Sequence, residues 1–363
     1  MRLRTPADIF GVDLFSCTVY NHAVHRVEIR LGLGGGSMLH ENELRRFASV
    51  ASGGRLVHAY CIEGADGVGK LDFALECARA VLCTGEIAPC GECDSCIKAA
   101  GGNHPDISVI VPSDSRKFIS IEQLRELRRD ASVVPNEGER KVYIIPNAHT
   151  LPARSQNALL KLLEEPPAAV VFFLLTSRRE ALLPTLRSRM ELISLPTVSA
   201  ARILNELRKL YPRLSEPELV SASERSGGRI GRARGLLEKS GIKLREDALL
   251  VLNSLLMPAS RKYEFISAVN LATTGKSDVA ALIFNELSFA FSDLIEAVCG
   301  KKTEFCFFDA GQQREYLRIY PLEKLVRCAR ITAETADRLY DNPNMNALMA
   351  WYADAIWAAA GRS

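Results

Sequence analysis

The stretch Gly64-Ala65-Asp66-Gly67-Val68-Gly69-Lys70 decides the fold of this chain. An apolar segment at residues 58–63 precedes it, and apolar residues at helical spacing follow it over 73–81. A strand, a glycine-rich loop and a helix in this order form the phosphate-binding loop of nucleotide-binding proteins, where backbone N–H groups and the helix N-terminus hold an anion. The candidate nucleotide-binding residues are therefore Gly64, Gly67, Gly69 and Lys70.

The residues that hold magnesium in such a site are missing from their usual places. A Ser or Thr normally follows the lysine and binds the metal, but this chain has Leu71. The apolar segment at 142–145 should end in acidic residues, yet Pro146 and Asn147 follow it. Three interpretations stay open: a relic loop that binds nothing, binding of ATP or ADP without turnover, and hydrolysis with replacement ligands, which the sequence disfavours.

Strand and helix patterns alternate along the first part of the chain. Continuous apolar runs predict buried strands at 58–63, 107–111, 142–145 and 170–175. Helices are predicted between them, one opened by a capping box of Ser120 and Gln123 and one stopped by Pro166 and Pro167. This alternation predicts an α/β fold with a parallel sheet covered by helices on both faces.

Beyond Pro196 the sequence predicts helices alone. A small helical unit contains the glycine-broken segment 226–231, in which Arg229 and the nearby Arg232 and Arg234 either approach phosphate or lie on a solvated face. Amphipathic helices follow, and one has a single apolar stripe made of Val279, Leu282, Ile283, Leu287, Phe291, Leu294 and Ile295. We therefore expect a phosphate-loop domain at 38–196, a helical lid at 197–242 and an all-α domain at 243–363.

Residues 1–37 match none of these patterns and are expected to be an unassigned leader. They end in a flexible glycine stretch at 34–36, just before Met38. Such a segment is typical of a linker or tag. We favour the alternative, a misassigned start with Met38 as the first residue, and assign the leader no function.

Composition limits the class of protein. The 363 residues suit two or three domains, with 47% hydrophobic and 25% charged residues. The net charge of +3 creates no strong basic field for nucleic acid. The longest apolar run, at 168–175, is too short for a membrane span, and no export signal opens the chain. The clustered spacing of four cysteines indicates metal binding in a reducing compartment, so a cytoplasmic location is expected.

Four of the ten cysteines lie close together: Cys83, Cys90, Cys93 and Cys96. Two consecutive Cys-x-x-Cys steps and a fourth thiol seven residues upstream can form a tetrahedral thiolate shell around structural Zn²⁺. An iron–sulfur cluster is the alternative, but no Cys-Pro completes a ferredoxin pattern. His104 and His149 have no ligand-like spacing, and we interpret them as structural.

The segment Leu186-Arg187-Ser188-Arg189-Met190 places arginines at the expected edge of the first domain. Arg189 is either an ordinary surface residue in a salt bridge or a group that acts on a neighbouring subunit. An arginine supplied in trans can stabilise the charge on a transferring phosphoryl group and raise turnover about 10³–10⁵-fold.

Taken together, these motifs resemble the bacterial clamp loaders, AAA+ proteins of the replicative DNA polymerase III. The resemblance is strong over 55–196 and rests on the loop through Lys70, the four cysteines and four further motifs. These motifs are His58-Ala59-Tyr60, His104-Pro105-Asp106, Asn157-Ala158-Leu159-Leu160-Lys161-Leu162-Leu163-Glu164-Glu165-Pro166-Pro167 and Leu186-Arg187-Ser188-Arg189. A weaker likeness to the family's oligomerising collar covers 342–348. Within the family, Leu71, Pro146 and Asn147 favour the delta-prime subunits over the gamma or tau motors.

The resemblance implies a role. A delta-prime subunit is a non-hydrolysing stator in a hetero-oligomeric ring with gamma/tau and delta, which loads the sliding clamp on primed DNA. It implies that Arg189 is an arginine finger for the neighbouring ATP, and that this part of the DNA polymerase III holoenzyme is not itself catalytic. Two alternatives stay open: an ATP-hydrolysing gamma/tau-like motor, and a stand-alone nucleotide- or metal-sensing adaptor.

Overall fold

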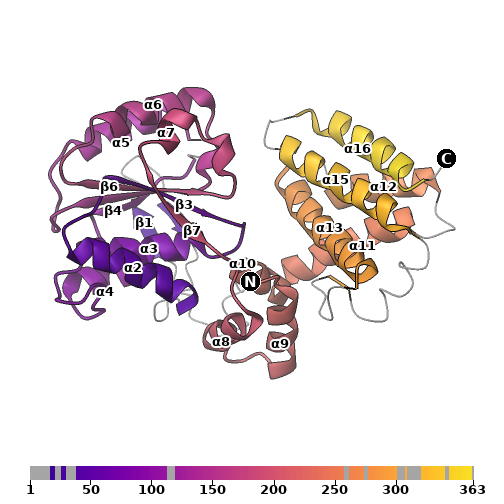
Figure 1. The fold of residues 1–363 in the computed structure, drawn as a ribbon, viewed down its shortest axis with the longest axis horizontal. Coiled ribbons are helices and arrows are strands. Elements are labelled where there is room, and N and C mark those ends of the chain that lie inside the picture. The colour runs from indigo at the N-terminus through magenta and orange to yellow at the C-terminus, as the bar shows by residue number, and fades with distance from the viewer. Residues whose placement is uncertain are drawn as a thin grey trace, which may run out of the picture. The chain divides into compact units, whose positions relative to one another are not determined.

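A computed structural model describes the ranges 17–20, 26–29, 38–112, 119–256, 261–273, 277–300, 307–308, 320–339 and 343–361. The chain forms two compact units (Figure 1). The first contains Met1–Leu214 and Gly228–Gly231, and the second contains Ser215–Gly227 and Arg232–Ser363. Each unit is described by itself below.

A parallel sheet of five strands forms the centre of the first unit, in the order β4-β5-β6-β3-β7. The strands are β3 (Ala59–Gly64), β4 (Ile107–Val109), β5 (Lys141–Ile145), β6 (Val170–Thr176) and β7 (Glu191–Leu195). In the register, Cys61 of β3 pairs with Leu174 on one side and Leu192 on the other. The predicted parallel sheet is confirmed, and β7 is an additional edge strand.

Helices cover both faces of this sheet (Figure 1). One face is covered by α2 (Glu41–Ser52) and α3 (Lys70–Leu82), and the other by α5 (Ile121–Ala131) and α6 (Ala153–Glu164). The predicted capping box at the start of α5 is present, with the Gln123 N–H donating to Ser120 Oγ. Shorter elements complete the unit: η1 (Met38–His40), α4 (Asp94–Ala100), η2 (Ala148–Thr150), η3 (Arg179–Ala181), α7 (Pro184–Arg187) and α8 (Ala200–Leu210).

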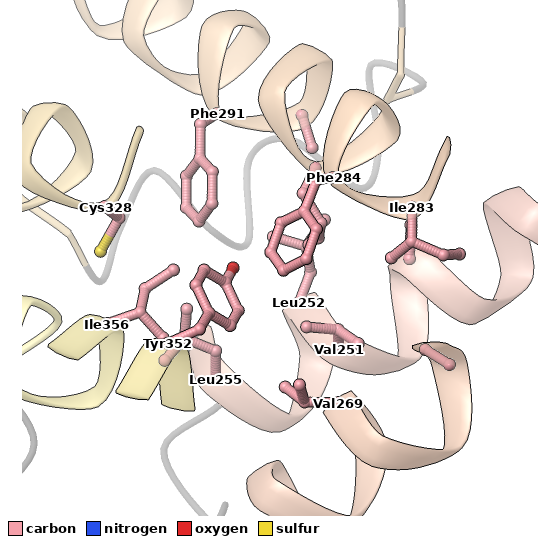
Figure 2. Close-up of a cluster of buried hydrophobic side chains, with 14 of the residues drawn as sticks. Val251, Leu252, Leu255, Val269, Ile283, Phe284, Phe291, Cys328, Tyr352 and Ile356 are labelled. Carbon is pink, nitrogen blue, oxygen red and sulfur yellow. The ribbon is translucent and has the colours of Figure 1, made fainter. Parts of the chain in front are cut away.

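The second unit is helical in its described part, as the sequence predicted. Its helices are α9 (Glu216–Arg225), most of α10 (Ile230–Leu237), α11 (Lys239–Leu256), α12 (Lys262–Thr273), α13 (Ser277–Val298), α15 (Leu322–Arg338) and α16 (Met345–Ala359). Their core contains Phe284, Phe291 and Tyr352 (Figure 2), and Phe284 meets Tyr352 edge to face with ring centroids 4.7 Å apart. The predicted stripe on α13 is largely buried, but Leu282 is 50% exposed and lies outside it.

The expected lid, 197–242, is divided between the two units, so α8 and the segment Gly228–Gly231 belong to the first. The proposed domain boundaries stay predictions. Within the expected leader, β1 (Cys17–Tyr20) and β2 (Arg26–Ile29) form an antiparallel pair, and the rest of 1–37 lies outside the described residues. Asn342 of the collar-like motif also lies outside them. Among the helices that are described, none combines the length and hydropathy needed to cross a bilayer.

Candidate functional site

The phosphate loop connects the carboxyl end of β3 to the first turn of α3. Gly69 precedes the helix with φ of 100°, a left-handed conformation that glycine adopts without strain. Lys70 is 8% exposed, and its ammonium donates to Gly64 O at 2.7 Å and to Ala65 O at 3.1 Å. The predicted loop residues are thus brought together, with the lysine folded back on the loop's own carbonyl groups.

The positions that should bind magnesium have other structural roles. Leu71 is partly buried and packs against the apolar core beneath α3. Asn147 is exposed, has φ of 50° and precedes η2, where its carbonyl accepts hydrogen bonds from Thr150. Hydrocarbon packing at Leu71 cannot supply the hydroxyl oxygen of a magnesium ligand.

A segment beyond the sheet closes over the loop. The Gly231 N–H donates to Gly67 O at 2.8 Å, and Ile230 is 1% exposed. A β-carbon at Gly231 would lie 2.9 Å from Gly67 Cα, so only glycine permits this close backbone approach. The sequence pattern identified the glycine-broken segment but gave no signal of its partner.

A second segment, just before α2, also contacts the loop. Leu39 and His40 are 3% and 4% exposed, and His40 Nε2 lies 3.0 Å from Val68 O. The cavity that these two residues line with Gly69 and Phe73 measures about 10 Å³, close to the volume of one water molecule. A nucleotide base at this place therefore requires one of the two segments to move.

Positive charge gathers around the loop. Burial lowers the pKa of Lys70, Asp66 opposes this effect, and Arg229 adds to it. Burial also lowers the pKa of His149 to about 4, with Arg178 and Lys70 acting in the same direction and Asp66 against them. Lys70, Arg178 and Arg229 thus place positive charge near the loop, and Asp66, 3.4 Å from the Lys70 ammonium, opposes it.

The four predicted metal ligands converge on one point. Their sulfur atoms all lie within 4.8 Å of one another, and the sulfurs of Cys90 and Cys96 are 4.0 Å apart. Tetrahedral Zn–S bonds of about 2.3 Å place sulfurs about 3.8 Å apart, so the donor set fits zinc. Such a shell has no open position for water, and the metal would stabilise the fold rather than supply chemistry.

Backbone N–H groups point at these sulfurs. The Cys90 N–H donates to Cys83 Sγ at 3.3 Å, and the Cys93 N–H donates to Cys90 Sγ at 3.3 Å. Burial raises the pKa of Cys93, but hydrogen bonds from Thr84 and Cys96 outweigh it and bring the pKa to about 5. Burial raises the pKa of Cys96 to about 12. A bound cation favours the thiolate at each position.

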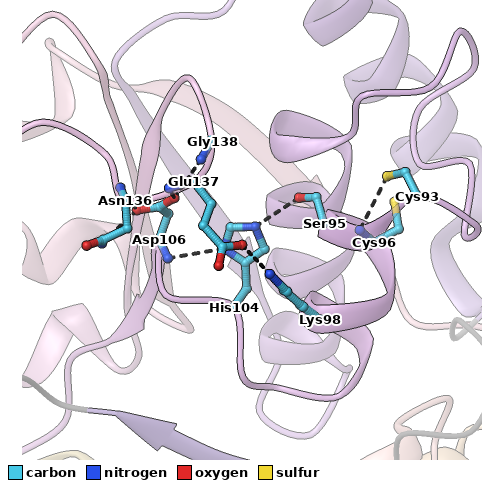
Figure 3. Close-up of polar contacts among 9 residues, drawn as sticks. All are labelled: Cys93, Ser95, Cys96, Lys98, His104, Asp106, Asn136, Glu137 and Gly138. Carbon is cyan, nitrogen blue, oxygen red and sulfur yellow. Dashed lines mark hydrogen bonds and ion pairs between the residues drawn. The ribbon is translucent and has the colours of Figure 1, made fainter.

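The cysteine cluster is anchored to the sheet through His104 and Asp106 (Figure 3). His104 Nε2 lies 2.9 Å from Ser95 Oγ on α4, and its Nδ1 accepts from the Asp106 N–H. The buried Asp106 carboxylate accepts four N–H bonds from residues 136–138, and these bonds hold its pKa low against the effect of burial. His104 therefore connects two structural features, in line with the structural role predicted for it.

Arg189 follows α7 on the first unit. Its guanidinium donates to Glu164 Oε1 at 2.9 Å and to Thr185 O at 2.9 Å, and its side chain is 37% exposed. It borders an open cavity of about 660 Å³ that is also lined by His58, Arg140 and Pro166. His58 precedes β3 and Arg140 precedes β5, so this cavity lies at the amino ends of the parallel strands.

The lid arginines have separate environments. Arg229 belongs to the first unit and lies close enough to Lys70 to lower its pKa. Arg232 belongs to the second unit, where it pairs with Glu286 at 3.0 Å with its side chain 8% exposed. Arg232 is therefore a buried, paired residue of its own unit and does not lie on a solvated face.

A family model and several known proteins match part of this chain. A family model described as DNA polymerase III, delta subunit, matches residues 39–199. The DNA polymerase III subunit delta' of Pseudomonas aeruginosa is 36% identical over 180 residues, which cover 48% of this chain and 55% of that protein. The subunit delta' of Bacillus subtilis is 37% identical over 140 residues, covering 38% of this chain and 42% of that protein. The chain thus spans about half the length of these relatives.

Other similar proteins are named as gamma or gamma/tau subunits. The DNA polymerase III subunit gamma/tau of Mycobacterium tuberculosis is 33% identical over 232 residues, covering 63% of this chain and 38% of that protein. A DNA polymerase III gamma subunit-related protein of Thermotoga maritima has a similar structure, with a TM-score of 0.42, 18% identity and coverage of 86% of this chain and 98% of that one. Over residues 39–199, the sequence matches confirm the resemblance of this chain to the DNA polymerase III clamp-loader subunits of the delta-prime kind.

Proposed function

We propose that this chain is the delta-prime subunit of a bacterial DNA polymerase III clamp loader and acts as a non-hydrolysing stator. It would assemble with gamma/tau and delta subunits in a hetero-oligomeric ring and help to place the sliding clamp on primed DNA. Its part in the reaction would be to hold its own domain rigid and to offer Arg189 to the ATP of the adjacent motor subunit.

One observation supports this proposal most: the phosphate loop and Arg189 lie at opposite ends of the sheet. The loop follows the carboxyl end of β3, and the cavity beside Arg189 lies at the amino end of the same strand. The six residues of β3 span about 17 Å at 3.3 Å per step. Arg189 is therefore too far from this chain's own loop to serve it, and a phosphate that it contacts must belong to another molecule.

Two further features agree with a stator. Leu71 packs into the core where a motor needs a metal ligand, and Gly231 bonds the loop where a motor needs space for nucleotide. The helical unit exposes large apolar side chains, among them Tyr263 at 81%, Leu271 at 64% and Leu282 at 50%. Exposed apolar residues of this size are typical of helix faces that pack against partner subunits, as a collar would require.

One reconstitution experiment separates the proposed stator from both alternatives, the ATP-hydrolysing motor and the stand-alone adaptor. The chain is mixed with gamma/tau and delta subunits of its own organism, and the complex is isolated by size-exclusion chromatography. The proposal predicts a stable complex, ATP turnover only when gamma/tau is present, and none by the isolated chain. Turnover by the isolated chain would support a motor, and failure to assemble would support an adaptor.

A further inference from the structure

Glu164 and Arg189 form an ion pair that connects the end of one helix to the segment after another. Glu164 is the last residue of α6, and Arg189 lies two residues beyond α7. Glu164 Oε1 accepts from the Arg189 guanidinium at 2.9 Å. The pair joins residues 25 positions apart, so it is a tertiary contact and not a pair within one helix.

The contact engages both ends of the guanidinium fork. One terminal nitrogen donates to Glu164, and the other donates to Thr185 O at 2.9 Å. These are the two nitrogens with which an arginine binds a phosphate in bidentate geometry. A phosphate that approaches Arg189 must therefore compete with the Glu164 carboxylate for the same donors and the same positive charge.

We propose that Glu164 is a positioning residue that holds Arg189 in a retracted state until a phosphate from the adjacent subunit displaces it. This inference rests on the proposed function, because it assigns a regulatory partner to the same arginine. Both side chains are substantially exposed, at 37% and 43%. An exposed pair of this kind is weak, so the dianionic or more highly charged phosphates of ATP can replace a single carboxylate.

The weakness of the Glu164–Arg189 ion pair also sets the size of the effect expected when it is removed. Measured exposed ion pairs correspond to a factor of about 1.5 to 5 in an equilibrium constant. Removing the charge of Glu164 should therefore lower the KM for ATP of the assembled complex by about 1.5- to 5-fold. The kcat should stay unchanged, because saturating ATP already displaces the carboxylate.

The test uses Glu164→Gln, which keeps the shape of the side chain and removes its charge. Glu165→Gln is the matched control, since Glu165 is the exposed neighbour and the described contacts of Arg189 do not include it. Each variant is reconstituted with gamma/tau and delta, and DNA-stimulated ATP turnover is measured over a range of ATP concentrations. Each is also combined with Arg189→Ala.

The inference predicts a lower KM for Glu164→Gln, an unchanged KM for Glu165→Gln, and no effect of Glu164→Gln once Arg189 is alanine. An unchanged or raised KM for Glu164→Gln, or an effect that persists without Arg189, would overturn it. Failure of the proposed function gives a different result, because Arg189→Ala alone would then leave turnover unchanged. The NMR resonance of Arg189 Nε in the isolated chain reports directly on the ion pair with Glu164. It should shift in Glu164→Gln and stay unchanged in Glu165→Gln.

Discussion

Replacing Gly231 by alanine should release the segment that closes the phosphate loop. The new β-carbon would lie 2.9 Å from Gly67 Cα and 3.2 Å from Gly67 O, whereas carbon atoms in contact normally lie about 3.5–4.0 Å apart. The two backbones must therefore separate by several tenths of an ångström. This movement strains or breaks the 2.8 Å hydrogen bond from the Gly231 N–H to Gly67 O.

The free-energy change that Gly231→Ala causes in docking of this segment is the sum of three contributions. Overpacking of this kind costs about 1–3 kcal/mol, and loss of the hydrogen bond adds about 1 kcal/mol. Alanine recovers at most about 1 kcal/mol, because it is a better helix former than glycine. The net effect is about 2 kcal/mol, or about a 30-fold shift from the docked to the undocked segment.

Hydrogen exchange followed by mass spectrometry measures this shift. Peptides that contain residues 64–70 and 228–231 should exchange about 30-fold faster in Gly231→Ala. Gly235→Ala is the matched control on the same helix, since a β-carbon there meets no described atom within 4 Å. This variant should slow exchange slightly, because alanine is the better helix former. Equal exchange in the two variants would refute the inference that backbone contact between Gly231 and Gly67 closes the loop.

Three further results are expected. Cys93→Ser removes one of four converging thiolates, so metal analysis should find less zinc and thermal unfolding should begin earlier; full zinc content would contradict the four-sulfur shell. Asp106→Asn loses charge-assisted hydrogen bonds from residues 136–138 and should lower the free energy of unfolding by about 2–4 kcal/mol. The control Asp94→Asn, at an exposed residue, should change it by less than about 0.5 kcal/mol. Similar values for both variants would contradict the role of Asp106 in anchoring the cysteine cluster to the sheet. His149 has a folded pKa of about 4 against an ordinary value of 6.5, so between these values the unfolded state binds more protons and stability is lost as pH falls. The loss between pH 7 and pH 5 should be about 2 kcal/mol in denaturant titrations, and an equal loss in His149→Gln would exclude His149 as its source.

The sequence predicted the sheet because its inner strands are continuous apolar runs. β7 was missed since it is an edge strand whose residues are mostly exposed, so it lacks such a run. Leu282 was placed on the buried stripe of α13 by its spacing alone, and the neighbouring helices that decide which side of α13 is covered leave it 50% exposed.

The candidate sites also contain features that the sequence predicted and features that it did not. The four cysteines lie within 14 residues, and their spacing alone predicted their convergence. The contacts Gly231–Gly67 and Glu164–Arg189 join segments far apart in the sequence, and neither has a local pattern. Arg189 was a candidate from its segment, and the resemblance implied its role, but its position at the amino end of the sheet required the strand order.

The central claim is that Arg189 acts on the ATP of a neighbouring subunit. The most direct measurement is the DNA-stimulated ATP turnover of the reconstituted clamp loader with this chain or its Arg189→Ala variant, after confirming that both complexes assemble equally. The account predicts that turnover at the neighbouring ATP site falls by about 10³-fold or more in the Arg189→Ala complex, because that site loses its arginine finger. Unchanged turnover in a fully assembled complex would contradict it and would make Arg189 an ordinary surface residue paired with Glu164.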